Sequence, residues 1–214
     1  MVEPAARAND DIDAVAIRRH DRRRAIAEIP VLVGIALVVA FLLKTFVAQA
    51  FVIPSGSMEP QLQIGDRVVV SKLAYRLHDP RRGDIIVFNS PEPHAANHDS
   101  PPIAFIKDVL EGVGLRQPDD DVLIKRVIGL PGETVEGRGG HVYVNGRQLI
   151  EPYLPAGLQT EDFPSTVVPD GSLWVMGDNR GNSRDSHLFG PIKKSAVIGR
   201  AIAKLWPPGS ISFL

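Results

Sequence analysis

Apolar residues gather in one long run near the N-terminus, from Ile29 to Ile53, and in several short runs after it. A helix needs about 20 residues to cross a bilayer core. The uninterrupted part of the long run, Val31–Leu43, is shorter than this and is followed by Lys44. We expect residues 29–53 to form one transmembrane helix, in which Lys44 either reaches an interface or ends the span.

A cleaved signal peptide is the alternative for this segment, because Ala48-Gln49-Ala50 fits a small-x-small cleavage site. The apolar core is long for a signal peptide, and the basic cluster Arg18–Arg24 lies well inside the chain, which favours an uncleaved anchor. Basic residues beside a span hold that end in the cytoplasm. We therefore expect a cytoplasmic tail over residues 1–28, and a chain that continues outside the cytoplasm under either interpretation.

Short apolar runs bounded by Gly, Pro, Asn and Asp predict β-strands in the rest of the chain. They lie at residues 67–71, 84–88, 122–128, 141–144, 147–150, 172–176 and 197–205. The runs at 67–71 and 84–88 are continuous, which predicts burial of both faces. Asn145-Gly146 is a strong hairpin signal. The expected fold is mainly β, with antiparallel sheets in a coiled, barrel-like catalytic domain over residues 54–214.

Residues 89–121 differ from this pattern. Prolines stand at both ends, and apolar residues recur between them at helical spacing. We expect an insert that carries one short amphipathic helix, the only notable helix outside the membrane.

Composition narrows the possible chemistry. With 24 basic and 25 acidic residues, the chain has no bulk charge that would favour nucleic acid. Without cysteine, it has no disulfide, thiolate nucleophile or Cys-based metal site. The six histidines show no metal spacing; His94 and His98 come nearest, in a stretch typical of a loop. We predict neither a metal nor a cofactor.

Two serines stand between two prolines in Pro54-Ser55-Gly56-Ser57-Met58-Glu59-Pro60. The prolines restrict the backbone and Gly56 permits a tight turn, so we expect a stiff, non-helical loop that presents Ser57. A serine becomes a nucleophile only when a neighbouring base takes its proton. Taken alone, the stretch is more typical of a surface turn.

Lys125 is a candidate for that base. It stands in an otherwise apolar predicted strand. A lysine in a strand usually points to solvent, but burial would lower its pKa. A neutral lysine beside a serine forms the Ser-Lys variant of the serine protease mechanism.

Four stretches, at residues 54–58, 82–88, 124–132 and 176–186, resemble the motifs of bacterial type I signal peptidases. They occur in the family's order, after an N-terminal anchor. The resemblance implies a serine endopeptidase of the cell membrane that removes signal peptides from exported pre-proteins after small residues, with no cofactor. Its partners would be signal peptides and the lipid bilayer, not nucleic acid.

The resemblance also implies roles for single residues. Ser57 matches the nucleophile, Lys125 the base, and Ser55 a donor that joins the Ser57 backbone N–H in the oxyanion hole. Ser183 matches a hydroxyl that orients the lysine ammonium. The residues that match positions holding the site's shape are Gly177, Asp178 and Asp185. The residues that match positions lining the shallow substrate pockets are Ile53, Leu62, Val68, Val87 and Ile124.

One position departs from the family pattern, in which an arginine often follows the Asp185-Ser186 pair. Here His187 stands there. We expect the salt bridge of Asp185 to involve Arg180 or Arg184, or to be weaker.

Geometry agrees with the same function. Ser57 lies four residues beyond Ile53, so the chain can carry it at most about 13–14 Å from the expected end of the span. A signal peptide exposes its cleavage site just beyond its own apolar segment.

Two other functions remain open. One is a catalytically inactive, membrane-anchored β-domain that binds exported proteins; the presence of both Ser57 and Lys125 argues against it. The other is a self-cleaving protease of the repressor type, against which the predicted anchor and the lack of a DNA-binding segment argue.

Overall fold

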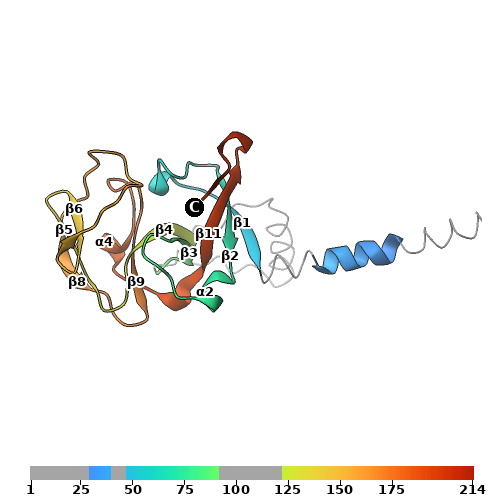
Figure 1. The fold of residues 1–214 in the computed structure, drawn as a ribbon, viewed down its shortest axis with the longest axis horizontal. Coiled ribbons are helices and arrows are strands. Elements are labelled where there is room, and N and C mark those ends of the chain that lie inside the picture. The colour runs from blue at the N-terminus through green and yellow to red at the C-terminus, as the bar shows by residue number, and fades with distance from the viewer. Residues whose placement is uncertain (1–28, 40–46, 92–121) are drawn as a thin grey trace, which may run out of the picture. The chain divides into compact units, whose positions relative to one another are not determined.

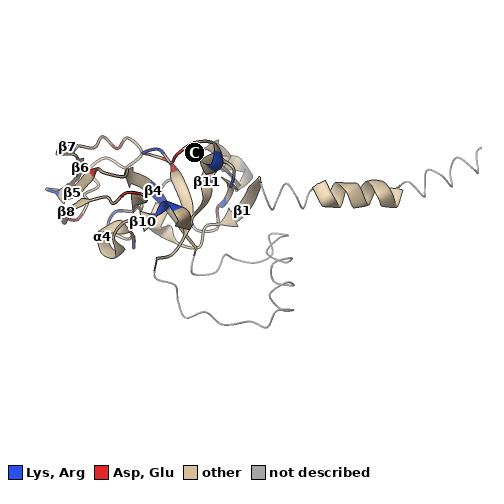
Figure 2. Cartoon of the chain, turned by 90° about the horizontal axis from the view of Figure 1, so that it is seen from below, with Lys and Arg blue, Asp and Glu red and all other residues tan. Residues whose placement is uncertain are grey.

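The computed structural model describes residues 29–39, 47–91 and 122–214. The chain divides into two compact units, Met1–Thr45 and Phe46–Leu214. In the first unit residues 29–39 are helical, and Figure 2 shows no charged residue in this helix. None of the helices in the described parts of the chain is long and apolar enough to cross a membrane. The predicted tail and residues 92–121 of the predicted insert lie outside the described residues.

The second unit is built on two antiparallel sheets (Figure 1). The larger has the order β1-β2-β11-β3-β4-β9-β10, with β12 paired to β11. Its strands are β1 (Ala48–Val52), β2 (Arg67–Ser71), β3 (Ile85–Asn89), β4 (Val122–Gly129), β9 (Ser172–Met176), β10 (Ile192–Lys193), β11 (Val197–Trp206) and β12 (Ser212–Phe213).

The smaller sheet has the order β7-β6-β5-β8. Its strands are β5 (Thr134–Arg138), β6 (His141–Val144), β7 (Arg147–Gln148) and β8 (Phe163–Val167). Asn145 and Gly146 both have positive φ, as the predicted hairpin turn requires. The short helices are η1 (Gly56–Met58), α2 (Ala74–Leu77), α4 (Ser186–Phe189), η2 (Lys194–Ala196) and η3 (Pro208–Ser210).

The expectation of a mainly β, antiparallel fold is confirmed. Neither sheet closes on itself within the described residues, so the domain is two open sheets rather than one hydrogen-bonded barrel. In β2, Arg67 is exposed while Val68 and Val70 are buried, so only one face of this strand is buried, contrary to the prediction. Strand β8 is not among the predicted strands; it contains Pro164 and lies at the edge of its sheet, where proline is tolerated.

The expected end of the transmembrane helix at Ile53 is wrong. Ala48–Val52 is strand β1, which pairs with β2 in a register that places Phe51 opposite Val68. Apolar β-branched and aromatic residues suit a strand as well as a membrane helix, and here β2 supplies the backbone hydrogen bonds. The estimate of 13–14 Å between the span and Ser57 therefore does not hold, because a strand stands between them.

Strand β4 connects the cores of the domain. Ile124 belongs to a cluster of buried residues that includes members of β2, β3 and β11, and the partly buried Phe51 of β1 packs against it. Ile128 belongs to a second cluster, in which Val135 of the smaller sheet packs on Trp174 and Met176 of β9. Lys125 lies between these two positions. The strand is buried throughout this stretch.

Candidate active site

Ser57 lies in η1, a single 3-10 turn, rather than in a fully non-helical loop. Only 7 % of the residue is exposed. Two hydrogen bonds from Asn179 hold η1 in place: its backbone N donates to Ser57 O at 3.0 Å, and its Nδ2 donates to Gly56 O at 3.0 Å. The nucleophile candidate is thus fixed by contacts to the turn that follows β9. Sequence reasoning did not single out Asn179.

Lys125 points into the protein and is 2 % exposed. Its Nζ lies 2.6 Å from Ser57 Oγ and donates to Ile124 O at 2.9 Å. A strand with one solvent face would turn this lysine outward; β4 has none over residues 124–129. The structure therefore brings together the predicted nucleophile and the predicted base, which are 68 positions apart in the sequence.

Burial lowers the pKa of Lys125 to about 8, against the opposing effects of Asp185 and Asp178, whose charges favour the ammonium. Water solvates an ammonium better than a protein interior does, so the neutral amine gains relative weight. A lysine with this pKa is partly neutral close to physiological pH and can accept a proton there.

The two other serines lie beside this pair. Ser55 Oγ is 3.4 Å from Ser57 Oγ and donates to it weakly. Ser183 Oγ is buried and has no hydrogen-bond partner among the described residues, so the expected hydrogen bond from the lysine to Ser183 is not made in this structure. Ser183 packs instead on Gly177, where a Cβ would lie 2.2 Å from Ser183 Oγ.

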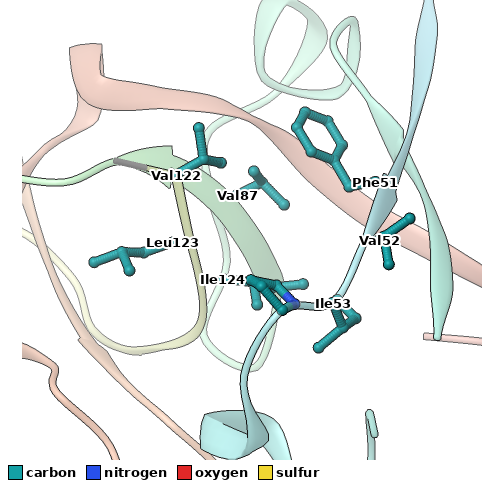
Figure 3. Close-up of a pocket in the computed structure, with 8 residues that line it drawn as sticks. Phe51, Val52, Ile53, Val87, Val122, Leu123 and Ile124 are labelled. Carbon is teal, nitrogen blue, oxygen red and sulfur yellow. The ribbon is translucent and has the colours of Figure 1, made fainter. Parts of the chain in front are cut away.

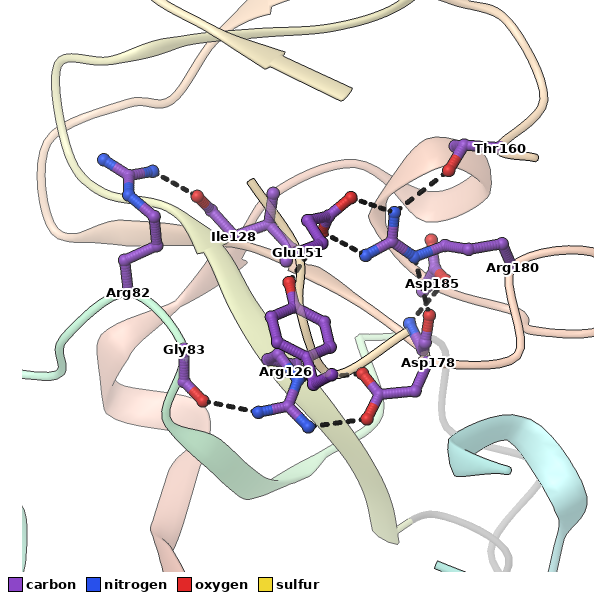
Figure 4. Close-up of polar contacts among 11 residues, drawn as sticks. Arg82, Gly83, Arg126, Ile128, Glu151, Thr160, Asp178, Arg180 and Asp185 are labelled. Carbon is purple, nitrogen blue, oxygen red and sulfur yellow. Dashed lines mark hydrogen bonds and ion pairs between the residues drawn. The ribbon is translucent and has the colours of Figure 1, made fainter. Parts of the chain in front are cut away.

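Asp178 is paired with Arg126, the residue that follows the lysine in β4 (Figure 4). Arg126 Nε and Nη2 donate to the two carboxylate oxygens at 2.8 and 2.6 Å, and Nη1 donates to Gly83 O at 2.9 Å. Sequence reasoning missed Arg126. The signal was available: consecutive residues of a strand point to opposite faces, so Lys125-Arg126 in a strand buried on both faces places a cation on each.

Asp185 is paired with His187, which corrects the expectation that Arg180 could take this place. His187 Nδ1 lies 2.6 Å from Asp185 Oδ1, and Asp185 Oδ2 accepts from Gly177 N at 2.9 Å. The hydrogen bond with Asp185 raises the pKa of His187 above its usual value. Arg180 instead forms an ion pair with Glu151.

Figure 3 shows a pocket lined by residues of β1, β3 and β4, including Ile124, the residue before Lys125. Three predicted substrate-binding residues line it, namely Ile53, Val87 and Ile124. The other two, Leu62 and Val68, are buried in the same apolar cluster and are not among the lining residues. The remaining lining residues are Phe51, Val52, Pro54, Val122 and Leu123.

The strands on the two sides of the pocket each have a backbone edge without a strand partner among the described residues. β1 ends its sheet and pairs only with β2. β4 pairs with β3 from Val122 onward but with β9 only from Arg126 onward. The first half of β4 therefore has no strand partner on its second edge among the described residues. The described residues contain no group of three or more His, Cys, Asp or Glu side chains that could hold a metal ion.

Comparisons with known proteins identify the family of this chain. The family described as "Signal peptidase, peptidase S26" matches residues 26–206. A "Probable signal peptidase I-1" of Synechocystis sp. is 45 % identical over 179 residues, which is 84 % of this chain and 81 % of the relative. "Signal peptidase I" of Mycobacterium tuberculosis is 37 % identical over 222 residues, covering 89 % of this chain and 76 % of the relative.

Among solved structures, a signal peptidase I from Enterococcus faecalis is 34 % identical. The match covers 57 % of this chain and 97 % of that one, with a TM-score of 0.40. The family match and the curated relatives extend over most of the chain. The chain therefore belongs to the signal peptidase family, peptidase S26, and is a type I signal peptidase.

Proposed function

We propose that this enzyme is a membrane-bound serine endopeptidase that removes signal peptides from exported pre-proteins with Ser57 as nucleophile and Lys125 as general base. One observation carries the proposal: Lys125 Nζ lies 2.6 Å from Ser57 Oγ in a buried site. Burial lowers the pKa of this lysine to about 8, which supports its role as a base.

Acylation begins with neutral Lys125. Its Nζ takes the proton of the Ser57 hydroxyl while Oγ attacks the carbonyl carbon of the scissile peptide bond. The oxyanion that forms accepts hydrogen bonds from the Ser57 backbone N–H and from Ser55 Oγ, which turns away from Ser57 Oγ to reach it. The C–N bond then breaks, the leaving amine takes the proton from the lysine ammonium, and the mature protein departs.

Deacylation uses the same base. Neutral Lys125 removes a proton from water, and the water oxygen attacks the acyl carbon of the ester on Ser57. The bond from this carbon to Ser57 Oγ breaks, and Oγ takes the proton back from the ammonium. The signal peptide leaves with a new C-terminal carboxylate, and the enzyme returns to its initial state.

The free edges of β1 and β4 suit an extended substrate. A peptide that adds to a sheet edge gains main-chain hydrogen bonds, while alternate side chains enter pockets and supply specificity. Ile53, Val87 and Ile124 line the pocket between these edges and offer only apolar surface. Small residues such as alanine, the pattern of an Ala-x-Ala site, suit this shallow apolar pocket.

Two features support a membrane location. The apolar run of residues 29–53 begins with a helix at 29–39, and the basic cluster Arg18–Arg24 favours a cytoplasmic N-terminus with the catalytic domain outside. The catalytic unit also carries four large, exposed apolar side chains close together in the sequence near Leu214, called here the C-terminal apolar patch: Leu205, Trp206, Ile211 and Phe213. Exposed patches of this kind mark membrane or protein contacts.

Cleavage of a peptide with an Ala-x-Ala site tests the proposal. Ser57→Ala removes only the nucleophilic oxygen and should abolish cleavage, whereas Ser55→Ala should cost about 10²–10³ in kcat as one oxyanion donor is lost. Lys125→Arg should be inactive although it keeps the charge, because a guanidinium does not deprotonate in this range.

Lys194→Arg is the matched control, because Lys194 forms a surface ion pair with Asp79 and should tolerate the change. Thermal unfolding should show that Ser57→Ala is folded. Equal losses in the two serine variants would mean that the serines are assigned wrongly. Binding of signal peptides without any cleavage by the unmodified chain would favour the inactive binding domain instead.

A further inference from the structure

The loop that joins β7 to β8 reaches from the smaller sheet to the active site. It carries Glu151 and Tyr153, and each contacts an arginine next to a residue of the site. Arg126 follows Lys125 in β4 and binds Asp178. Arg180 follows Asp178 by two positions, in the turn that fixes η1. Neither Glu151 nor Tyr153 has a role in the proposed reaction.

Tyr153 covers Arg126. The guanidinium carbon lies 3.9 Å from the centroid of the Tyr153 ring, a close cation–π contact. The donors at the edge of the guanidinium are directed at Asp178 and Gly83 O. The ring therefore occupies a face of Arg126 that solvent would otherwise reach, and Arg126 is buried.

Glu151 connects this ring to the turn after β9. Tyr153 Oη donates to Glu151 Oε1 at 2.6 Å, and the same carboxylate pairs with Arg180 Nη1 and Nη2 at 2.9 and 2.5 Å (Figure 4). Arg180 Nε donates to Gly177 O at 3.0 Å, and Arg180 Nη1 also donates to Thr160 Oγ1 at 2.9 Å. Contacts thus run without a break from Arg126 to Gly177.

We propose that Glu151 and Tyr153 act as positioning residues for the base of the proposed reaction. Together they form a clasp, the Glu151–Tyr153 clasp, which holds the Asp178–Arg180 turn against β4 and keeps water away from the Arg126–Asp178 ion pair beside Lys125. The inference rests on the proposed function, because it assigns the clasp to the environment of its base.

The clasp matters because opposing effects of burial and charge set the pKa of Lys125. Asp185 and Asp178 face the lysine and raise its pKa, while burial lowers it more strongly. Arg126 offsets the charge of Asp178, and the groups that face Tyr153 are Glu151, Arg180 and Arg126. Without the ring, water reaches the Arg126–Asp178 ion pair and weakens it, so Arg126 offsets less of the charge of Asp178. The charge of Asp178 then favours the ammonium form of Lys125 more strongly, so less neutral base is present at neutral pH.

The experiment measures kcat/KM from pH 6 to pH 10 for the full chain in detergent, with an Ala-x-Ala peptide. In Tyr153→Ala we expect the acid limb to move to higher pH by about 0.5–1 pH unit, a loss of about 3–10-fold at pH 7 that disappears near pH 10. Glu151→Gln keeps the packing and weakens the pair with Arg180, so we expect a smaller shift in the same direction.

Tyr143→Ala is the matched control, because Tyr143 also stacks on an arginine, at 4.4 Å from the exposed Arg138. Its acid limb should stay in place. The clasp proposal is overturned if Tyr153→Ala and Glu151→Gln keep the limb of the unmodified enzyme, or lose activity by the same factor at every pH, as a purely structural role would give.

Failure of the proposed function has a different signature. In that case the unmodified enzyme lacks an acid limb near pH 8, or Lys125→Arg remains active. If the limb is present and Lys125→Arg is inactive, an unmoved limb in the clasp variants overturns the clasp alone.

Discussion

Lys125 lowers the stability of the folded state and is also the base of the proposed reaction. Its ammonium form is poorly solvated in β4, which is why burial lowers its pKa to about 8. The same burial must destabilise the folded state wherever the lysine is charged. An apolar residue of similar length should therefore be better for stability and fatal for activity.

Lys125→Met should raise the free energy of unfolding at pH 7. The folded pKa of about 8 lies below the ordinary value of 10.5, and this difference corresponds to about 3 kcal/mol. Loss of the hydrogen bonds to Ser57 Oγ and Ile124 O returns about 2 kcal/mol, which leaves a gain of about 1 kcal/mol. Urea denaturation at pH 7 measures it.

The pKa of Lys125 is lowered in the folded state, and the direction of this shift determines how the gain in stability depends on pH. The charged lysine penalises the folded state fully below pH 8, and the penalty disappears as pH rises from about 8 to 10.5, because the unfolded chain then loses its proton too. The advantage of Lys125→Met should therefore shrink by pH 10.5. Lys194→Met on the surface should show no such gain, and an unchanged or lower stability of Lys125→Met at pH 7 would contradict a desolvated lysine.

Single residues could be predicted from the sequence where a motif contains them. Their hydrogen-bond and ion-pair partners could not be predicted, because these depend on the fold. Ser57, Lys125, Asp178 and Asp185 could be placed from the four family-like stretches, although their roles stay predictions. The partner of Asp185 could not, because His187 lies in α4 and its orientation depends on the fold.

At the scale of elements, the site depends on close packing between the end of β9 and η1. Gly177 follows β9, and a Cβ there would lie 2.2 Å from Ser183 Oγ and 2.4 Å from Ser57 O. Contacts this short are not found for real Cβ atoms, so a larger residue must push η1 away. The glycine is required by this approach and not by a left-handed backbone.

Gly177→Ala should therefore move Ser57 relative to Lys125. A displacement of about 1 Å can cost about 10²-fold in rate, so we expect a loss of that order in kcat with the chain still folded. Gly181→Ala is the matched control in the same turn, because a Cβ at Gly181 meets nothing within 4 Å. Peptide cleavage and thermal unfolding measure both variants. Equal activity in the two would show that η1 does not need the close approach.

The elements that the sequence missed have identifiable physical reasons. Strand β1 continues an apolar run, and hydropathy alone cannot tell where a helix gives way to a strand whose partner, β2, comes later in the chain. Strand β8 contains a proline that an edge position tolerates. Strands such as β9 and β11 were predicted well, because their apolar runs are bounded by turn residues.

At the scale of the whole molecule, the unit Phe46–Leu214 combines the buried Ser57–Lys125 pair with the exposed C-terminal apolar patch. Phe213 of β12 is 93 % exposed, and Trp206 at the end of β11 is about half exposed. The unit Phe46–Leu214 has its own cores and is compact by itself. We expect it to fold without the N-terminal unit and to bind lipid vesicles through the patch.

Replacing both Trp206 and Phe213 with serine should lower vesicle binding of the unit 46–214 at least several-fold, because aromatic side chains supply much apolar contact area. Cosedimentation with phospholipid vesicles measures it. Leu77→Ser with Ile150→Ser is the control, since both residues are highly exposed but lie in α2 and after β7, outside the patch. Equal loss in the two double variants would contradict a membrane role for the patch.

The central claim, a Ser57 nucleophile with Lys125 as its base, is tested most directly by the pH dependence of kcat/KM for an Ala-x-Ala peptide. Neutral lysine is the active form, and burial lowers its pKa to about 8. The rate should rise about tenfold per pH unit below that value and level off above it. His187→Gln, which removes another titrating group near the site, should keep this limb. A flat profile from pH 6 to pH 10, or a limb that disappears in His187→Gln, would contradict the account.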